Sequence, residues 1–298
     1  MINELVSIVG NENIMQDEPM RNHTTFKVGG PADYLVTPHS EKEISELIKL
    51  CHTKEVPYFI IGNGSNLIVK DNGIRGVVIK LGNNFAECRV EGNRLYIGAG
   101  ALMSKIGKVA LENSLTGFEF GAGIPGTVGG AVVMNAGAYG GEIKDVIVSA
   151  TVLTESGDIK EVDKEGLQLG YRTSCIISNK YIVLSVCLEL KEGNQEAIRN
   201  KMNELATARR EKQPLEYPSA GSTFKRPEGY FAGKLIMDTG LRGYKVGGAQ
   251  VSTKHCGFVI NAGNATAQDI LDLICDIQDR VEDKFGVRLE TEVKVVGE

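Results

Sequence analysis

The chain has 298 residues, of which 42% are hydrophobic and 24% charged, a balance typical of folded globular proteins. This length is enough for two or three domains of ordinary size. The formal net charge is −5 and the isoelectric point is near 5.6, whereas general binding of nucleic acid or anionic membranes needs a basic face. These values argue against both kinds of partner, but not against a small basic pocket for an anionic substrate.

The cysteines and histidines give no sign of a metal site. Six cysteines occur without any CxxC pair, and their spacing fits no zinc pattern. Only four histidines are present, so we predict no metal. The N-terminal residues are polar and lack a signal-peptide core, and no apolar run approaches the roughly 18 residues of a membrane span. We therefore expect a cytoplasmic protein with reduced thiols and no membrane insertion.

The first predicted helix covers residues 41–54. Ser40 and Glu43 have the spacing of a capping box at its start. Four apolar side chains then recur at helical spacing, which predicts that one face is buried. These side chains are Ile44, Leu47, Ile48 and Cys51.

Short apolar runs between turn residues predict the strands. They cover residues 58–61, 67–70, 76–81, 94–98, 146–154, 181–190 and 288–296. A second helix is predicted between the fourth and fifth of these strands, over residues 102–112. Its expected buried side consists of Leu102, Ile106, Val109 and Ala110.

Two longer helices are predicted in the C-terminal half. The first is amphipathic, covers residues 195–212 and ends in a basic cluster. After Pro214 the composition changes to turn-forming residues, and we place a domain boundary there. The last helix covers residues 267–285, with Thr266 at its start and Gly286 as a stop. Its expected buried stripe consists of Ile270, Leu273, Ile274, Ile277 and Val281.

The segment 121–141, GAGIPGTVGGAVVMNAGAYGG, contains eight glycines and four alanines. Glycine permits positive φ angles, so that successive N–H groups can converge on a phosphate or diphosphate. Small side chains also let the backbone come close to a large ligand. On the residues alone, a tight structural loop packed under other elements is an equally good interpretation.

A second glycine loop, GNGSN at residues 62–66, lies between two strand-like runs. No amphipathic helix follows it, so the context of a Rossmann fingerprint is missing, and the chain has no GxxxxGK[ST] phosphate loop. Its backbone amides and its Ser and Asn side chains are suited to a diphosphate. Two such loops, about sixty residues apart, suggest that one long dinucleotide-like cofactor lies between two subdomains.

Six motifs in a fixed order carry a resemblance to a known family. They are NHTTFKVGGPADYLV (22–36), IGNGSNLIV (61–69), GAGIPGTVGGAVVMNAGAYGGE (121–142), YRTS (171–174), PSAGSTFKRP (218–227) and LETEVKVVG (289–297). From about residue 20 onward, the chain resembles the UDP-N-acetylenolpyruvoylglucosamine reductases (the MurB family) of bacterial peptidoglycan synthesis. The short spacing between Arg172 and Ser222 resembles the compact type II form of that family.

The resemblance implies an α+β fold with three parts. Two subdomains would form an FAD-binding module of the vanillyl-alcohol-oxidase (PCMH) type, and a C-terminal α+β domain would bind the substrate. We expect the first subdomain to comprise residues 1–81 and the returning terminal strand 288–298. The second subdomain would then comprise residues 82–213, and the substrate domain residues 214–287.

By the same resemblance, the two glycine loops hold the diphosphate of a non-covalent FAD. The expected cofactor-binding residues are Ile61, Gly62, Asn63, Gly64, Ser65, Asn66, Gly121, Ala122, Gly123, Ile124, Gly126, Thr127, Gly129, Gly130 and Gly137. NADPH would reduce the flavin and leave, and a hydride would then pass from flavin N5 to the enolpyruvyl ether of UDP-N-acetylglucosamine. The expected product is UDP-N-acetylmuramate.

Three residues match the family's active-site positions. Arg172 would stabilise the enolate that forms beside the substrate carboxylate, because a guanidinium is always charged and offers two donors. Ser222 would protonate this enolate at carbon. Glu292 would assist, although the residues alone do not distinguish it from Glu290 on the same face of the predicted strand. Without the resemblance, these residues would be interpreted as a surface ion pair, a turn serine and solvated carboxylates.

Four further residues are expected to contact the substrate. They are Tyr171, Lys212, Lys225 and Arg226. Arginine suits the diphosphate of a nucleotide sugar through paired hydrogen bonds, whereas Lys225 could equally be a solvated side chain. We expect His255 to be structural, and we expect a monomer whose partners are this substrate and NADPH.

Two alternative functions follow from the same residues. An FAD oxidase or dehydrogenase of the same superfamily could act on another substrate, but such enzymes often attach FAD through a loop histidine, and neither glycine loop contains one. A non-catalytic nucleotide-binding protein is the other alternative. It would be expected to lose Arg172, Ser222 or Glu292, and all three are present.

Overall fold

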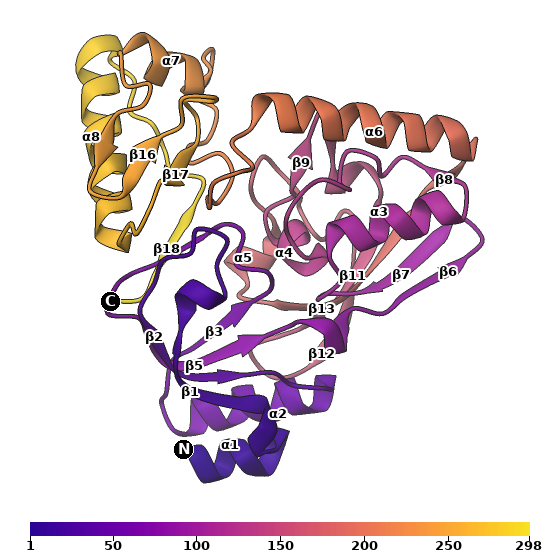
Figure 1. The fold of residues 1–298 in the computed structure, drawn as a ribbon. Coiled ribbons are helices and arrows are strands. Elements are labelled where there is room, and N and C mark those ends of the chain that lie inside the picture. Colours follow the sequence, from indigo (N-terminus) through magenta and orange to yellow (C-terminus); the bar gives the residue numbers. More distant parts are fainter. The chain divides into compact units, whose positions relative to one another are not determined.

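The computed structural model describes residues 1–298, which divide into two compact units (Figure 1). Unit 1 comprises Met1–Gln16, Tyr34–Asn63 and Gly76–Ala208. Unit 2 comprises Asp17–Asp33, Gly64–Arg75 and Arg209–Glu298. The expected division into three domains stays a prediction.

The α-helices are α1 (Ile2–Val9), α2 (Glu41–Thr53), α3 (Met103–Glu112), α4 (Val128–Val133), α5 (Cys175–Ser178), α6 (Gln195–Lys212), α7 (Ala232–Asp238) and α8 (Ala267–Phe285). The strands are β1 (Ile14–Pro19), β2 (Pro31–Val36), β3 (Tyr58–Ile61), β4 (Leu67–Val69), β5 (Ile74–Lys80), β6 (Cys88–Glu91), β7 (Arg94–Gly98), β8 (Leu115–Thr116), β9 (Gly137–Ala138), β10 (Gly141–Glu142), β11 (Ile147–Leu153), β12 (Ile159–Asp163), β13 (Ile182–Glu189), β14 (Lys191–Glu192), β15 (Lys245–Val246), β16 (Ala249–Val251), β17 (Val259–Asn261) and β18 (Lys294–Val296). The predicted strands that correspond to β3, β4, β5, β7, β11 and β13 are confirmed to within two residues at each end.

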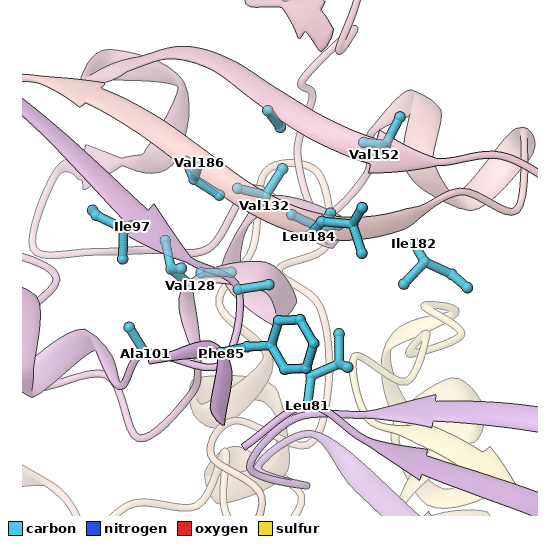
Figure 2. Close-up of a cluster of buried hydrophobic side chains, with 14 of the residues drawn as sticks. Leu81, Phe85, Ile97, Ala101, Val128, Val132, Val152, Ile182, Leu184 and Val186 are labelled. Carbon is cyan, nitrogen blue, oxygen red and sulfur yellow. The ribbon is translucent and has the colours of Figure 1, made fainter. Parts of the chain in front are cut away.

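The centre of unit 1 is an antiparallel sheet with the strand order β12-β11-β13-β7-β6. Helix α4 packs on β13 and β7 of this sheet. Its Val128 and Val132, one helical turn apart, lie among Ile97, Leu184 and Val186 (Figure 2). We predicted only a loop in the segment that contains α4. Its paired glycines have poor helix propensity, and burial of the two valines overrides that preference.

Helix α2 begins and packs as predicted. The Ser40 side chain accepts a hydrogen bond from the Glu43 N–H at 3.2 Å, and the four predicted side chains are buried. The helix packs against α1. A four-stranded sheet has the order β1-β2-β5-β3, and β3 and β5 are parallel. Strand β3 ends at Ile61 and leads directly into the GNGSN loop.

Unit 2 is built around α8, whose buried stripe contains all five predicted side chains. Thr266 and Asp269 form a reciprocal capping box, and Gly286 ends the helix with a φ of 66°. Helix α8 packs against α7 and the small sheet β15-β16-β17. The terminal strand β18 pairs in parallel with β4, with Lys294 opposite Leu67.

Three predicted elements differ from the structure. Leu102 is the residue before α3 and is 43% exposed, because its backbone is extended and Met103 takes the buried position. Helix α6 has the predicted bounds and basic end, but it buries only Ile198, so the expected buried face is missing. The terminal strand is confined to β18, and the residues before it form an isolated β-bridge, between Phe224 and Thr291, instead of a strand.

Candidate active site

The two glycine loops meet in unit 1. Gly62 follows β3 directly, and a side chain at this position would come inside 3.0 Å of Thr127 Oγ1. Beside it, Asn63 Nδ2 donates a hydrogen bond to the carbonyl oxygen of Pro125 at 2.6 Å. The first residues of the GNGSN loop therefore lie against the GAGIPGT segment, at a separation that requires glycine at position 62.

Both loops carry backbone N–H groups that have no acceptor in the protein. They belong to Gly62, Asn63, Gly123 and Gly126, all of which are at least partly exposed. Exposed N–H groups of this kind can bind water or a ligand, and neighbouring amides form binding sites for phosphate groups. This donor set fits the diphosphate of a dinucleotide cofactor.

The remaining predicted cofactor-binding residues surround these contacts. Ile61 ends β3, and Thr127 immediately precedes α4. The others in unit 1 are Gly121, Ala122 and Ile124 in the loop before α4, Gly129 and Gly130 within α4, and Gly137 in β9. Whether each of them contacts a cofactor stays a prediction.

The rest of the GNGSN loop belongs to unit 2. Gly64 has a φ of 60°, and a side chain there would come inside 3.0 Å of the His23 carbonyl oxygen. The Thr25 N–H donates to the Gly64 carbonyl at 3.2 Å, and Thr25 Oγ1 donates to the Ser219 carbonyl at 2.7 Å. Through Thr25, the loop that contains Gly64 and Ser65 is connected to the segment that carries Ser222.

Unit 2 also joins the segments that carry Ser222 and Glu292. Ser222 is exposed and lies between Gly221, which has a φ of 75°, and the fully buried Thr223. The Glu292 N–H donates to the Thr223 carbonyl at 2.8 Å. Asn66 Nδ2 in turn donates to the Glu292 carbonyl at 3.1 Å. Two of the three predicted catalytic residues are therefore on directly hydrogen-bonded segments.

Thr223 fixes the backbone next to Ser222. Its N–H donates to the Gly257 carbonyl at 2.9 Å, and its Oγ1 accepts from the Val259 N–H at 2.9 Å. Because Thr223 is buried, these bonds are shielded from water and hold the exposed serine at a defined place.

The structure separates the two candidate glutamates. Glu290 Oε2 pairs with Lys225 Nζ at 3.0 Å, and the Glu290 side chain is 75% exposed. Glu292, in contrast, is partly buried, and its backbone is bonded on both sides to the loops described above. This arrangement favours Glu292 as the neighbour of Ser222 and gives Lys225 an acidic partner.

Arg172 lies in unit 1, in a turn closed by a bridge between Gly170 and Thr173. Its backbone has a φ of 57°, which is unusual for a residue other than glycine. The guanidinium lies 5.2 Å from the centre of the exposed Tyr171 ring. Since Ser222 and Glu292 belong to unit 2, the convergence of the three residues on one reacting group stays a prediction.

The other expected substrate contacts are on the surface of unit 2. Lys212 is the last residue of α6 and is exposed. Arg226 Nε donates to the Tyr230 carbonyl at 3.3 Å, and its guanidinium lies 4.0 Å over the Phe231 ring. Phe231 is itself 59% exposed, so this stacked pair presents both a cation and an aromatic face to solvent.

His255 has the environment of a structural residue. Its Nδ1 accepts a hydrogen bond from the Gly257 N–H at 3.1 Å, and its ring packs 5.0 Å from that of Phe258. Burial lowers the pKa of His255 below its usual value, so the neutral ring is favoured. A neutral, bonded imidazole agrees with the structural role that we expected.

A hollow of about 680 Å³ lies over β11 and β12, away from the predicted residues. Its lining includes Ser149, Lys160 and Tyr181. Lys160 Nζ already donates to the Tyr181 hydroxyl at 2.7 Å, and Ser149 Oγ donates to Glu161 at 2.5 Å. None of the predicted site residues lines this hollow.

No helix of the chain has the length and apolar character needed to cross a membrane.

Two protein-family models match this chain, one over the glycine loops and one over the segments of Ser222 and Glu292. Residues 32–163 match the FAD binding domain, and residues 213–296 match the C-terminal domain of UDP-N-acetylenolpyruvoylglucosamine reductase. The chain therefore carries an FAD-binding domain, and its cofactor is FAD. The first match includes the loops that contain Gly62 and Gly126, and the second includes Ser222 and Glu292.

Relatives of similar length cover almost the whole chain. A UDP-N-acetylenolpyruvoylglucosamine reductase of Clostridioides difficile (strain 630) is 55% identical over 294 residues, covering 99% of this chain and 97% of the relative. One of Clostridium kluyveri (strain NBRC 12016) is 55% identical over 295 residues, with the same coverage.

Solved structures give the same result for the fold. The UDP-N-acetylenolpyruvylglucosamine reductase of Thermus caldophilus has a TM-score of 0.82 and 37% identity, covering 95% of this chain and 98% of that one. p-Cresol methylhydroxylase has a TM-score of 0.50 and 16% identity, and covers 64% of this chain and 43% of the other. The second likeness concerns the fold alone. Together they confirm the predicted α+β fold with a PCMH-type FAD-binding module.

Proposed function

Because the chain belongs to the UDP-N-acetylenolpyruvoylglucosamine reductase family, we propose that it reduces UDP-N-acetylglucosamine enolpyruvate to UDP-N-acetylmuramate. NADPH is the proposed reductant, and it leaves as NADP⁺. FAD, when bound, supplies the hydride-transfer chemistry between NADPH and the substrate. The alkene gains a hydride at its terminal carbon and a proton at the neighbouring carbon, which carries the carboxylate.

The observation that supports this chemistry most directly is the backbone hydrogen bond between the segments that carry Ser222 and Glu292. A carbanion next to a carboxylate is a strong base, so even a serine hydroxyl can donate the proton if it is held at the right carbon. Ser222 is exposed on a firmly bonded backbone, with the Glu292 N–H on the carbonyl of the next residue. Ser222 is therefore the proposed proton donor, and Glu292 its acidic neighbour at the substrate carboxylate.

Arg172 is the proposed electrostatic stabiliser. Hydride addition moves negative charge onto the substrate carboxylate, and a fixed guanidinium can bind both carboxylate oxygens. The amides of Gly62, Asn63, Gly123 and Gly126 would bind the FAD diphosphate. Lys212, Lys225, Arg226 and Tyr171 would contact the nucleotide sugar.

The test begins with the purified protein. Denaturation should release a yellow flavin, and NADPH consumption should depend on added UDP-N-acetylglucosamine enolpyruvate. Consumption of NADPH without dependence on this substrate would favour an oxidase or dehydrogenase of the superfamily. No consumption and no flavin would favour a non-catalytic protein.

The two half-reactions then test the proton donor. Ser222→Ala should leave reduction of the flavin by NADPH intact and slow its reoxidation by the substrate by roughly 10²–10⁴-fold. Ser219→Ala, three residues earlier in the same loop, is the matched control and should change neither rate. Equal loss of both half-reactions in Ser222→Ala would show that Ser222 is structural.

We further propose that the protein works as a monomer in the cytoplasm. All six cysteines are free thiols, which is typical of proteins in reducing compartments. Size-exclusion chromatography with light scattering would test the oligomeric state, and a dimer mass would contradict this part of the proposal.

A further inference from the structure

A fully buried asparagine connects three segments near the Arg172 turn. Asn135 is 0% exposed. Its Nδ2 donates to Glu142 Oε2 at 2.8 Å and to the Gly170 carbonyl at 3.0 Å, while its Oδ1 accepts from the Lys144 N–H at 2.9 Å. With three bonds in three directions, the amide has one orientation, and loss of it would remove these bonds from partly buried groups.

The backbone at this position also selects asparagine. Asn135 has a φ of 43°, in the left-handed region that asparagine, aspartate and glycine tolerate better than other residues. It lies just after α4, whose Val128 and Val132 anchor the helix in the core of unit 1. The amide of Asn135 is therefore attached to a rigid element.

The Arg172 turn is tied to the end of α4 on both of its sides. On one side, the Gly170 carbonyl accepts from Asn135. On the other side, Ser174 Oγ donates to the Val133 carbonyl at 2.7 Å. Arg172 lies between these anchors with an unfavourable φ of 57°, and such a conformation persists only where the surroundings hold it.

Glu142 adds a carboxylate to this hydrogen-bonded network. It pairs with Lys144 Nζ at 2.9 Å and accepts the hydrogen bond from Asn135. The hydrogen bond from Lys144 has the largest effect in lowering the pKa of Glu142, and the charge of Arg172 acts in the same direction. Glu142 is therefore ionised at neutral pH, which suits it to accept the hydrogen bond from Asn135.

We infer that Asn135 and Glu142 are positioning residues for Arg172. Asn135 holds the turn on the end of α4, and Glu142 fixes the Asn135 amide that does so. Thr127 immediately precedes helix α4 and contacts the cofactor loop at Gly62. The same short helix therefore fixes Arg172 relative to the cofactor loops within unit 1. The inference rests on the proposed function for what Arg172 does, but not for how it is held.

The first test measures how firmly the turn is held, in the full-length protein with FAD added. Trypsin cleaves after Arg172 when the turn opens, and mass spectrometry quantifies that one cut. Asn135→Gly keeps the left-handed backbone and loses all side-chain bonds, whereas Asn135→Asp keeps the shape but loses both donors. Each should speed cleavage by about tenfold or more. Asn264→Gly, at an exposed residue with a φ of 53°, is the matched control and should leave it unchanged.

The second test separates positioning from simple folding. Both Asn135 variants should slow flavin reoxidation by the enolpyruvyl substrate by roughly 10–100-fold, because small misplacements of a binding group are costly. Reduction by NADPH should stay within about threefold of the parent. Glu142→Gln, which keeps the shape of the side chain, should show the same pattern, and it decides the matter if the Asn135 variants do not fold.

Unchanged cleavage at Arg172, or equal loss of both half-reactions, would overturn the inference. A parent protein that does not oxidise NADPH with the substrate would instead refute the proposed function. In that case the cleavage rates would still decide whether Asn135 holds the turn.

Discussion

Replacing Gly62 with alanine tests whether the two glycine loops depend on their close contact. The new methyl carbon would come inside 3.0 Å of Thr127 Oγ1 and 3.3 Å from Thr127 Cβ and Cγ2. Thr127 is only 5% exposed and precedes α4, so it has little room to move. The φ of Gly62 is not positive, so alanine strains no backbone angle and the contact alone is tested.

Its effect on stability follows from two opposing contributions. Overpacking of this kind costs about 1–3 kcal/mol, and the reduced freedom of the unfolded chain returns about 0.4–1 kcal/mol. We expect a net loss of about 1–2 kcal/mol in the free energy of unfolding. At about 2–4 °C per kcal/mol for a chain of this size, the melting temperature should fall by about 2–8 °C.

Urea denaturation of the apoprotein measures this loss. Thr127→Ala removes the clashing oxygen, which makes no hydrogen bond to the helix it precedes. The double variant should therefore be more stable than the sum of the single effects by about 1 kcal/mol. Gly130→Ala is the matched control, because its methyl carbon would lie 3.6 Å from the same oxygen, an ordinary contact. Additive effects, or Gly62→Ala as stable as the parent, would refute the reasoning.

Three further predictions concern unit 2. Thr223→Val should cost about 1–3 kcal/mol in urea denaturation, because the buried Val259 N–H loses its acceptor, whereas Thr223→Ser should cost less. Hydrogen bonds from backbone N–H groups lower the pKa of Asp269, so the stability that its carboxylate contributes is present at neutral pH. This contribution is lost as the pH falls below the ordinary value of about 3.9. Between pH 7 and pH 3, the free energy of unfolding should therefore decline less for Asp269→Asn than for the parent. Lys225→Ala should raise the KM for the nucleotide sugar, whereas Glu290→Ala should not, and neither should change stability by more than about 1 kcal/mol because their ion pair is exposed. An equal rise in KM for both variants would indicate that the pair acts only on the local structure.

Helices with local signals were predictable from the sequence. The capping residues Ser40 and Thr266 and the stop at Gly286 are local, and α2 and α8 begin and end close to where these residues predict. Helix α4 was not predicted, since its stability comes from burying Val128 and Val132 rather than from its glycines. Helix α6 shows the reverse case, in which the helix was predicted but its burial was not. Its amphipathic pattern predicted a buried face, yet only Ile198 is buried.

In the candidate site, too, some features were predictable from the sequence and others depend on contacts made in the folded chain. The glycine loops were recognisable from composition, and the structure adds that Asn63 and Pro125 join them. The segments of Ser222 and Glu292, about seventy residues apart in the chain, are joined by a hydrogen bond that no periodicity reveals. Asn135 lies inside a quoted motif but gave no signal, because its importance comes from three bonds made in the folded chain.

A crystal structure with FAD and UDP-N-acetylglucosamine enolpyruvate bound tests the central claim most directly. The account predicts the FAD diphosphate within about 2.7–3.2 Å of the N–H groups of Gly62, Asn63, Gly123 or Gly126. It also predicts that Arg172 and Ser222 reach the same enolpyruvyl group. A diphosphate bound elsewhere on the chain, or an enolpyruvyl group that contacts neither side chain, would contradict it.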